Sequence, residues 1–454
     1  MGSCGCTSCC GGAGRMPGAA GLAMVPSPTA QAMPGATVVH LLGGGVGLRS
    51  FGVLEGGQWV DIYLSAGPND GAGGAHDASC KSKNDANCAL DRVRWNLAAG
   101  EDAEVTRVSS FGGSRDCAGG LGDVQPALSP DQTKLAWVRH CHDGGGTHRE
   151  SDLLVEEAGS IGSVATGTAE EDRPHFPNWY TNDILLYHTK SGDDHGTLWA
   201  TTSSTPPFAP YRLLGQGGLY ENDTSFKDAN THPNPEHSAG LPPRIVTFGG
   251  AFKSASGLPE QTPRVTNFLG SFEEALDLTG EGDETFTECH HPAWNVSGTE
   301  ILCMRNREPE HPDGRRQPWL KALYKFSWDE RSSTWRNRGL LFVACSLDAL
   351  KSTFPAFFST VNVAGVTYKY AEWCGSDKHV LATVYLSDDD ENVLMSRVML
   401  IDISTPKTPT YRDISSVVER MGPDSGGGSR TNWHAIYGTC SVAHPGPWWV
   451  PCAG

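Results

Sequence analysis

A short pattern recurs along this chain and limits the possible folds more than any other feature of the sequence. In its fullest form, Gln125 to Trp137, a proline and a Ser-Pro-Asp turn lead into an apolar run. The segment His291 to Cys303 keeps the same nine-residue step, from 126 to 135 in one copy and from 292 to 301 in the other. Looser copies, roughly 48 to 80 residues apart, begin at Arg173, His232, Tyr370 and Arg430.

Each copy predicts a unit of four short strands. The turn leads into a second strand such as Lys134 to Arg139, a third such as Lys321 to Phe326 and a fourth such as Tyr411 to Ile414. Because one such unit cannot bury both of its faces alone, a series of units predicts an all-β β-propeller with four-stranded blades. Six blades are favoured, with seven as the alternative, and we expect the last strands to close the ring against the first.

The repeat also resembles a known family. A Pro-x-Trp/Leu-Ser-Pro-Asp pattern, followed by an apolar run and a Leu/Val-rich strand, is similar to the repeat of TolB-like six-bladed β-propellers, over about Val124 to Ala443. That family includes binding modules, the propeller parts of peptidases and some carbohydrate lyases. The resemblance therefore implies a fold and leaves the ligand or substrate open.

Two regions of different character divide the chain. Residues 1–36 are rich in Gly, Ala, Pro and Cys and carry one charged side chain, Arg15, so we expect a disordered or processed segment. Residues 37–454 are expected to form a single propeller domain. Gly2 and the cysteines between Cys4 and Cys10 look like an acylation segment, which would give a lipid anchor, whereas a secretory signal is the rival hypothesis.

Charge and hydropathy exclude two classes of partner. The chain has 35 Lys+Arg against 52 Asp+Glu, a net charge of -17, and no basic stripe, which argues against nucleic-acid binding. No run of 18 apolar residues is available to span a bilayer.

The cysteines outside the N-terminal segment leave the redox state open. Their even number and the glycosylation sequons at Asn222 and Asn295 are compatible with an oxidising compartment. Cys303 and Cys345 lie inside apolar strands, where we expect small buried thiols.

The propeller topology predicts one functional face. The connection from the fourth strand to the next first strand and the loop between strands two and three emerge on the same side, around the channel mouth. We therefore expect the ligand-binding residues to be those at the start of the inner strands: Gln125, Arg173, His232, His291, Tyr370 and Arg430.

Histidines on the same face suggest a second hypothesis, a divalent metal ion. Imidazole is a common metal ligand, and the candidate ligands are His140, His142, His232, His290 and His291. Loop histidines that are merely solvated or that cap backbone groups are the other interpretation. Two functions thus stay open: a binding module for a protein, peptide or glycan, or a metal-assisted lyase or hydrolase that uses these histidines and Arg173.

Overall fold

The computed structural model divides the chain into two units, residues 1–45 and 46–454, and every residue that it describes lies in the second unit. The described residues are 58–67, 88–109, 117, 120–142, 148–168, 172–191, 195–202, 211–212, 232–233, 244–247, 264–267, 273–277, 290–306, 321–341, 351, 355–359, 363, 365–388, 393–419, 434–441 and 443. The predicted segment 1–36 lies outside them, and its acylation or secretion stays a prediction.

The described strands form four sheets of four strands and one sheet of eight. Blade 1 has the strand order β24 (His434–Cys440), β1 (Trp59–Gly67), β2 (Ala89–Asn96) and β3 (Glu101–Arg107). Blade 2 consists of β4 (Gly120–Leu128), β5 (Lys134–His142), β6 (His148–Glu157) and β7 (Ser160–Gly167). Blade 3 consists of β8 (Pro174–Trp179), β9 (Ile184–Ser191), β10 (His195–Thr202) and β11 (Tyr211–Arg212).

The eight-stranded sheet contains two further runs of four. Blade 4 consists of β12 (His232–Pro233), β13 (Arg244–Thr247), β14 (Arg264–Asn267) and β15 (Glu273–Asp277), and blade 5 of β16 (His290–Trp294), β17 (Glu300–Asn306), β18 (Lys321–Asp329) and β19 (Thr334–Leu340). A short parallel pairing between β15 and β19 joins them. Blade 6 consists of β20 (Gly365–Cys374), β21 (Ser376–Ser387), β22 (Val393–Asp402) and β23 (Thr410–Asp413), and the described helices are α2 (Pro355–Phe358) and α3 (Ser415–Glu419).

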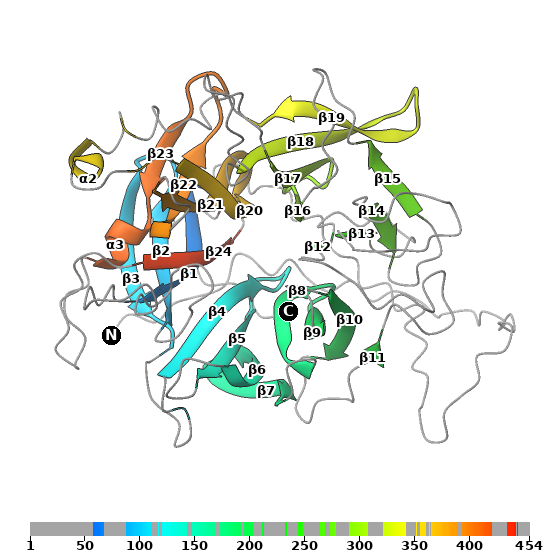
Figure 1. Cartoon of the computed structure of the whole chain (residues 1–454), viewed down its shortest axis with the longest axis vertical. Helices are drawn as coiled ribbons and strands as arrows, with labels where there is room; N and C mark the ends of the chain where they lie inside the picture. Colours follow the sequence, from blue (N-terminus) through cyan, green and yellow to red (C-terminus); the bar gives the residue numbers. More distant parts are fainter. Residues whose placement is uncertain are drawn as a thin grey trace, which may run out of the picture. The chain divides into compact units, whose positions relative to one another are not determined.

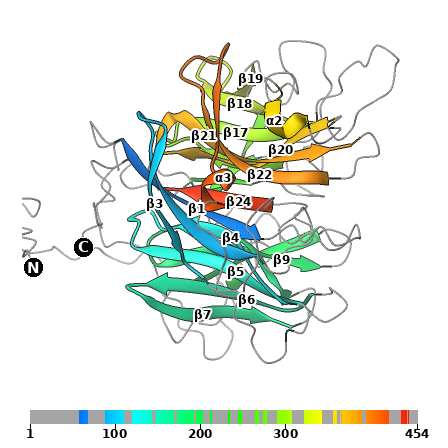
Figure 2. The same cartoon turned by 90° about the vertical axis from the view of Figure 1, so that its left-hand side faces the viewer.

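The first strands of these runs contact one another in a closed circuit. β24 contacts β4, β4 contacts β8, β8 contacts β12, β12 contacts β16, β16 contacts β20, and β20 contacts β24 (Figure 1). Within blade 2, the strands follow one another from β4 beside β1 to β7 at the outside (Figure 2). This arrangement is a β-propeller, as the repeat predicts. The described strands make six runs of four, and the number of blades in the whole chain stays a prediction.

The last strand closes the ring against the first ones, which confirms the expected closure. β24 pairs antiparallel with β1, from Ile62 opposite Cys440 to Gly67 opposite His434. A disulfide between Cys374 and Cys440 also ties β24 to β20 of blade 6. Blade 1 therefore depends on a strand that lies more than three hundred residues away in the sequence.

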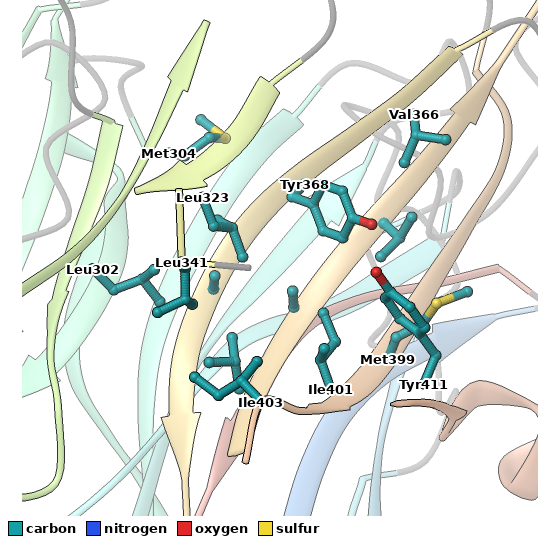
Figure 3. Close-up of a cluster of buried hydrophobic side chains, with 14 of the residues drawn as sticks. Leu302, Met304, Leu323, Leu341, Val366, Tyr368, Met399, Ile401, Ile403 and Tyr411 are labelled. Atoms are coloured by element: carbon teal, nitrogen blue, oxygen red, sulfur yellow. The ribbon is translucent and has the colours of Figure 1, made fainter. Parts of the chain in front are cut away.

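Apolar side chains fill the space between neighbouring blades. Between blades 5 and 6, Leu302 and Leu323 meet Tyr368 and Ile401 in one buried cluster (Figure 3). Because inner strands are covered on both faces, they are buried nearly throughout: in β4 only the first and last residues are half-buried. Side chains that alternate along an inner strand thus pack against the two neighbouring blades. A residue reaches the central axis only where the strand departs from this regular alternation.

The structure corrects one sequence expectation and adds to the description of one sequon. Cys303 is disulfide-bonded, as are Cys88 and the pair Cys117–Cys141, so the expected free thiol at Cys303 is wrong. An apolar strand position buries a disulfide as readily as a thiol. The Asn295 side chain is buried and bonds to Ser297 and to backbone amides of the following turn, so this sequon is not accessible for glycosylation. None of the helices in the described part of the chain has the length and apolarity needed to cross a membrane.

Candidate ligand-binding site at the centre of the ring

Five inner strands share an unusual backbone feature. Each carries one non-glycine residue with φ between 47° and 57°, and these residues are Gln125, Phe176, His291, Tyr370 and Tyr437. At each of them the pairing with the next strand shifts register, which identifies a β-bulge. A left-handed conformation is costly for bulky residues and persists only where the surroundings impose it. The left-handed conformation recurs at the bulge of all five inner strands, so the same structural requirement imposes it in each of these blades.

The local sequence explains the bulges in three strands. Gln125, Phe176 and His291 each precede a proline, which has no N–H to donate to the strand ladder and is therefore placed at bulges. In β24, Tyr437 precedes Gly438, where a Cβ atom would lie 2.5 Å from the Leu381 side chain of blade 6. The close approach of β24 to β21 of blade 6 favours glycine there.

The bulge residues meet one another across the ring, and we call them the central cluster. Ring centroids are 4.3 Å apart for Tyr370 and Tyr437, 4.5 Å for His291 and Tyr370, and 5.4 Å for Phe176 and His291. Phe176 of blade 3 also stacks on Tyr370 of blade 6 at 5.9 Å. Since blades 3 and 6 are not neighbours in the circuit, these contacts are possible only at the centre of the ring.

Hydrogen bonds hold the cluster in this arrangement. The bulge frees the Phe176 N–H from the strand ladder, and it donates to Oε1 of Gln125 at 2.7 Å. In the same way the Tyr437 N–H donates to Oγ1 of Thr383 at 3.0 Å. Gln125 and His291 are buried, while the three other members are half-buried, so part of their surface remains open to solvent. The Tyr437 hydroxyl donates to the Tyr370 hydroxyl at 3.5 Å.

A half-buried carboxyl lies along the chain directly after the tyrosine pair. Glu372 follows Tyr370 by two residues, Thr439 follows Tyr437 by two, and the Thr439 hydroxyl donates to Oε2 of Glu372 at 2.9 Å. Burial raises the pKa of Glu372 to about 7, and the hydrogen bond from Thr439 opposes this shift only in part. The inner strands β20 and β24 therefore share a carboxyl that changes charge near neutral pH.

Two of the predicted metal-binding histidines, His140 and His142, do not lie where the sequence analysis placed them, and His140 lies near the central cluster. His140 and His142 were expected in the loop after the second strand, but both are buried inside β5, which continues to residue 142. The His140 ring is edge-on to His175 at 5.2 Å, and His175 is the neighbour of Phe176 in β8. Strand pairing with β6 and the Cys117–Cys141 disulfide keep this segment within the sheet.

The remaining predicted residues divide into two groups. Gln125, His291 and Tyr370 belong to the central cluster, and Arg173 lies directly before β8. His232 and His290 lie on the inner strands β12 and β16, but their side chains are not among those described, and Arg430 lies outside the described residues. In the described part of the chain, no group of three or more His, Cys, Asp or Glu could hold a metal ion. The metal site stays a prediction.

Sequence analysis missed two members of the cluster, Phe176 and Tyr437. Phe176-Pro177 repeats the residue-proline pattern of Gln125-Pro126, whereas the predicted copy that begins at Arg173 matches Pro174 with Pro126. Tyr437 has no proline after it. The last copy was placed at Arg430, seven residues before the observed bulge at 437.

Comparisons with known proteins do not identify a family for this chain. No family model and no curated protein matches this chain. Among solved structures, it is similar to TolB from Acinetobacter baumannii, with 12% identity, 77% of this chain and 66% of that chain covered, and a TM-score of 0.41. It is also similar to a protein described as TolB from Agrobacterium tumefaciens, with 11% identity, 86% and 100% covered, and a TM-score of 0.42.

A third solved structure is the β-propeller domain of the trilobed protease from Pyrococcus furiosus, with 12% identity, 79% and 90% covered, and a TM-score of 0.35. The match spans slightly less than two thirds of the Acinetobacter protein and nearly all of the other two. The similarity concerns the fold. At these values it carries no information about a ligand or an activity.

Proposed function

We propose that this protein is a binding module whose central cluster recognises a segment of a protein or peptide partner, with a glycan as the other possible ligand. The supporting observation is the convergence of five bulge residues from five blades on one point. Functional sites are a common location for residues held in sparsely populated backbone conformations. A bulge next to a site re-aims one side chain, as each of these does.

The side chains of the cluster suit recognition of a partly apolar ligand. Tyrosine and phenylalanine offer large, stiff apolar surfaces, and tyrosine adds a hydroxyl, which is why such residues dominate binding surfaces. His291 and Gln125 add directional hydrogen-bonding groups from the neighbouring blades. No observation on the described residues favours the metal-assisted alternative.

Selection experiments with two central variants and one matched control test this proposal. Random displayed peptides and an array of neutral glycans would be selected on the wild type and then measured on Phe176→Ala, Tyr437→Ala and the control Trp328→Ala. Trp328 is a half-buried aromatic residue of β18, where it packs on Trp335 rather than in the central cluster. Thermal midpoints of all variants would show that the fold is retained.

The proposal expects selected ligands to lose about 10-fold or more in affinity in both central variants, as for a binding hot spot, and to be unaffected by Trp328→Ala. Ligands that bind the central variants as tightly as the wild type would place the site elsewhere. Failure to select any ligand would contradict the proposal as well.

A further inference from the structure

Arg173 differs from Arg94 of blade 1 and Arg139 of blade 2 in the hydrogen bonding of its guanidinium group. The guanidinium groups of Arg94 and Arg139 each form two hydrogen bonds to a carboxylate on the adjacent strand, at 2.7 and 3.0 Å and at 2.7 and 2.8 Å. Arg173 is half-buried and its Nε is fully buried, yet none of the described residues accepts a hydrogen bond from that N–H. A buried donor without an acceptor is destabilising, and in native proteins it indicates a role for that group.

The backbone fixes the position of Arg173 tightly. Arg173 lies on the connection from β7 to β8, and this connection passes directly over Gly167 at the end of β7. A Cβ atom on Gly167 would lie 2.2 Å from the carbonyl oxygen of Asp172 and 2.7 Å from Cα of Arg173. The arginine is thus placed by close packing against blade 2.

The distance to the central cluster suits one short ligand. Arg173 precedes Phe176 by three residues, which in an extended strand corresponds to about 10 Å between their Cα atoms. Between them, His175 contacts His140 of blade 2 and Phe176. A ligand of two or three residues is therefore long enough to reach both the guanidinium and the aromatic rings.

We propose that Arg173 binds a carboxylate of the peptide recognised at the central cluster, an inference that rests on the proposed function. The planar guanidinium fork matches a carboxylate with two parallel hydrogen bonds. A single carboxylate on a short peptide, such as its C-terminus, also fits the net charge of -17, because a strongly acidic protein repels polyanionic glycans. The carboxylate supplies the acceptor that Nε lacks.

The test uses a defined probe: an N-acetylated tripeptide of phenylalanine and two glycines, with either a free C-terminal carboxylate or an amide. Binding to the full chain would be measured by saturation-transfer NMR and calorimetry up to about 10 mM, well above a millimolar Kd. The variants are Arg173→Gln, Arg173→Lys and the control Arg331→Gln, which removes one positive charge from the exposed turn between β18 and β19. A glucuronate disaccharide and its neutral analogue form a second arm.

We expect the acid to bind the wild type about 10- to 100-fold more tightly than the amide. This preference should vanish in Arg173→Gln, fall in Arg173→Lys, which keeps the charge without the fork, and persist in Arg331→Gln. Equal binding of acid and amide, or no binding of either, would overturn the inference. An Arg173-dependent preference for the uronate disaccharide over the peptide would overturn its peptide assignment.

The two proposals can fail separately. If Phe176→Ala and Tyr437→Ala abolish tripeptide binding while Arg173→Gln leaves the preference for the acid intact, the central site stands and the role of Arg173 is wrong. If none of these variants changes binding, both proposals are wrong.

Discussion

Replacing Cys374 and Cys440 with alanine should selectively loosen the last strand of the ring. The two inner strands β20 and β24 are linked side by side by three contacts: Tyr370 with Tyr437, Glu372 with Thr439, and the Cys374–Cys440 disulfide. Only the last of these links is covalent. If this disulfide is the clasp of the propeller, meaning the link that holds the closing strand in the ring, its loss should let β24 open locally before the other strands do.

The size of the effect follows from the loop that the disulfide closes. Cys374 and Cys440 are separated by 66 residues, whereas Cys117 and Cys141, which join two parts of blade 2, are separated by 24. The chain-entropy model gives a stabilisation of about 4 kcal/mol for the longer loop and about 3 kcal/mol for the shorter one. Both double-alanine variants should therefore be less stable than the wild type by similar amounts. The free energy of unfolding alone does not show that the Cys374–Cys440 disulfide holds the closing strand.

Hydrogen exchange provides the distinction. In the Cys374→Ala/Cys440→Ala variant, the amides of β24 should exchange faster than those of β21, because local opening of the closing strand becomes cheaper than global unfolding. In the Cys117→Ala/Cys141→Ala control, β24 should keep the protection of the core strands. If β24 and β21 lose protection equally in both variants, the β1 pairing and the apolar packing hold the last strand, and the clasp interpretation is wrong.

Two further predictions concern the same pair of strands. The pKa of Glu372 is raised from 4.5 to about 7, so the wild type should lose about 3 kcal/mol of unfolding free energy relative to Glu372→Gln as the pH rises from about 4.5 to above 7. Urea denaturation of both proteins at pH 5 and pH 8 measures this loss of stability. A difference between the two proteins that does not change with pH would refute the prediction. The comparison with the variant is needed because the pKa of His188 is lowered to about 3, so His188 changes the stability of both proteins in the opposite direction below about pH 6.5. Gly438→Ala should cost about 1 to 3 kcal/mol, because its Cβ would lie 2.5 Å from Leu381, and an unchanged thermal midpoint would show that β24 shifts freely.

The fold was predictable because each copy of the repeat contains several signals that all indicate a four-stranded blade. A turn, an apolar run and a Leu/Val-rich strand recur together in blades 2 and 5, where Gln125 and His291 begin equivalent segments. Ring closure by the C-terminal strand was expected for the same reason, since an open ring would leave an unpaired edge. The pairing of β15 with β19 left no trace in the sequence, because it involves two residue pairs at the outer edges of blades 4 and 5.

The candidate site was only partly predictable. A residue before a proline identified Gln125 and His291, and the same rule finds Phe176 once Pro177 is used. Tyr437 could not be found this way, because no proline follows it and the close approach of Gly438 to blade 6 is a tertiary interaction. Strand length misled the prediction for His140 and His142, since nothing in the sequence shows that β5 continues to residue 142.

The bulges explain why a repeat that specifies the fold so well says little about the ligand. Regular residues of an inner strand alternate between the two neighbouring blades, so their identities are restricted by packing and the pattern repeats. The bulge residue leaves this alternation and contacts its counterparts at the centre, as Phe176 contacts Tyr370 of the opposite blade. Its side chain is therefore free to differ between blades, and it does: glutamine, phenylalanine, histidine and two tyrosines occupy the position. Specificity in such a ring lies in the one position per blade that the fold leaves unconstrained, which is why the chemistry of the site had to be read from the structure.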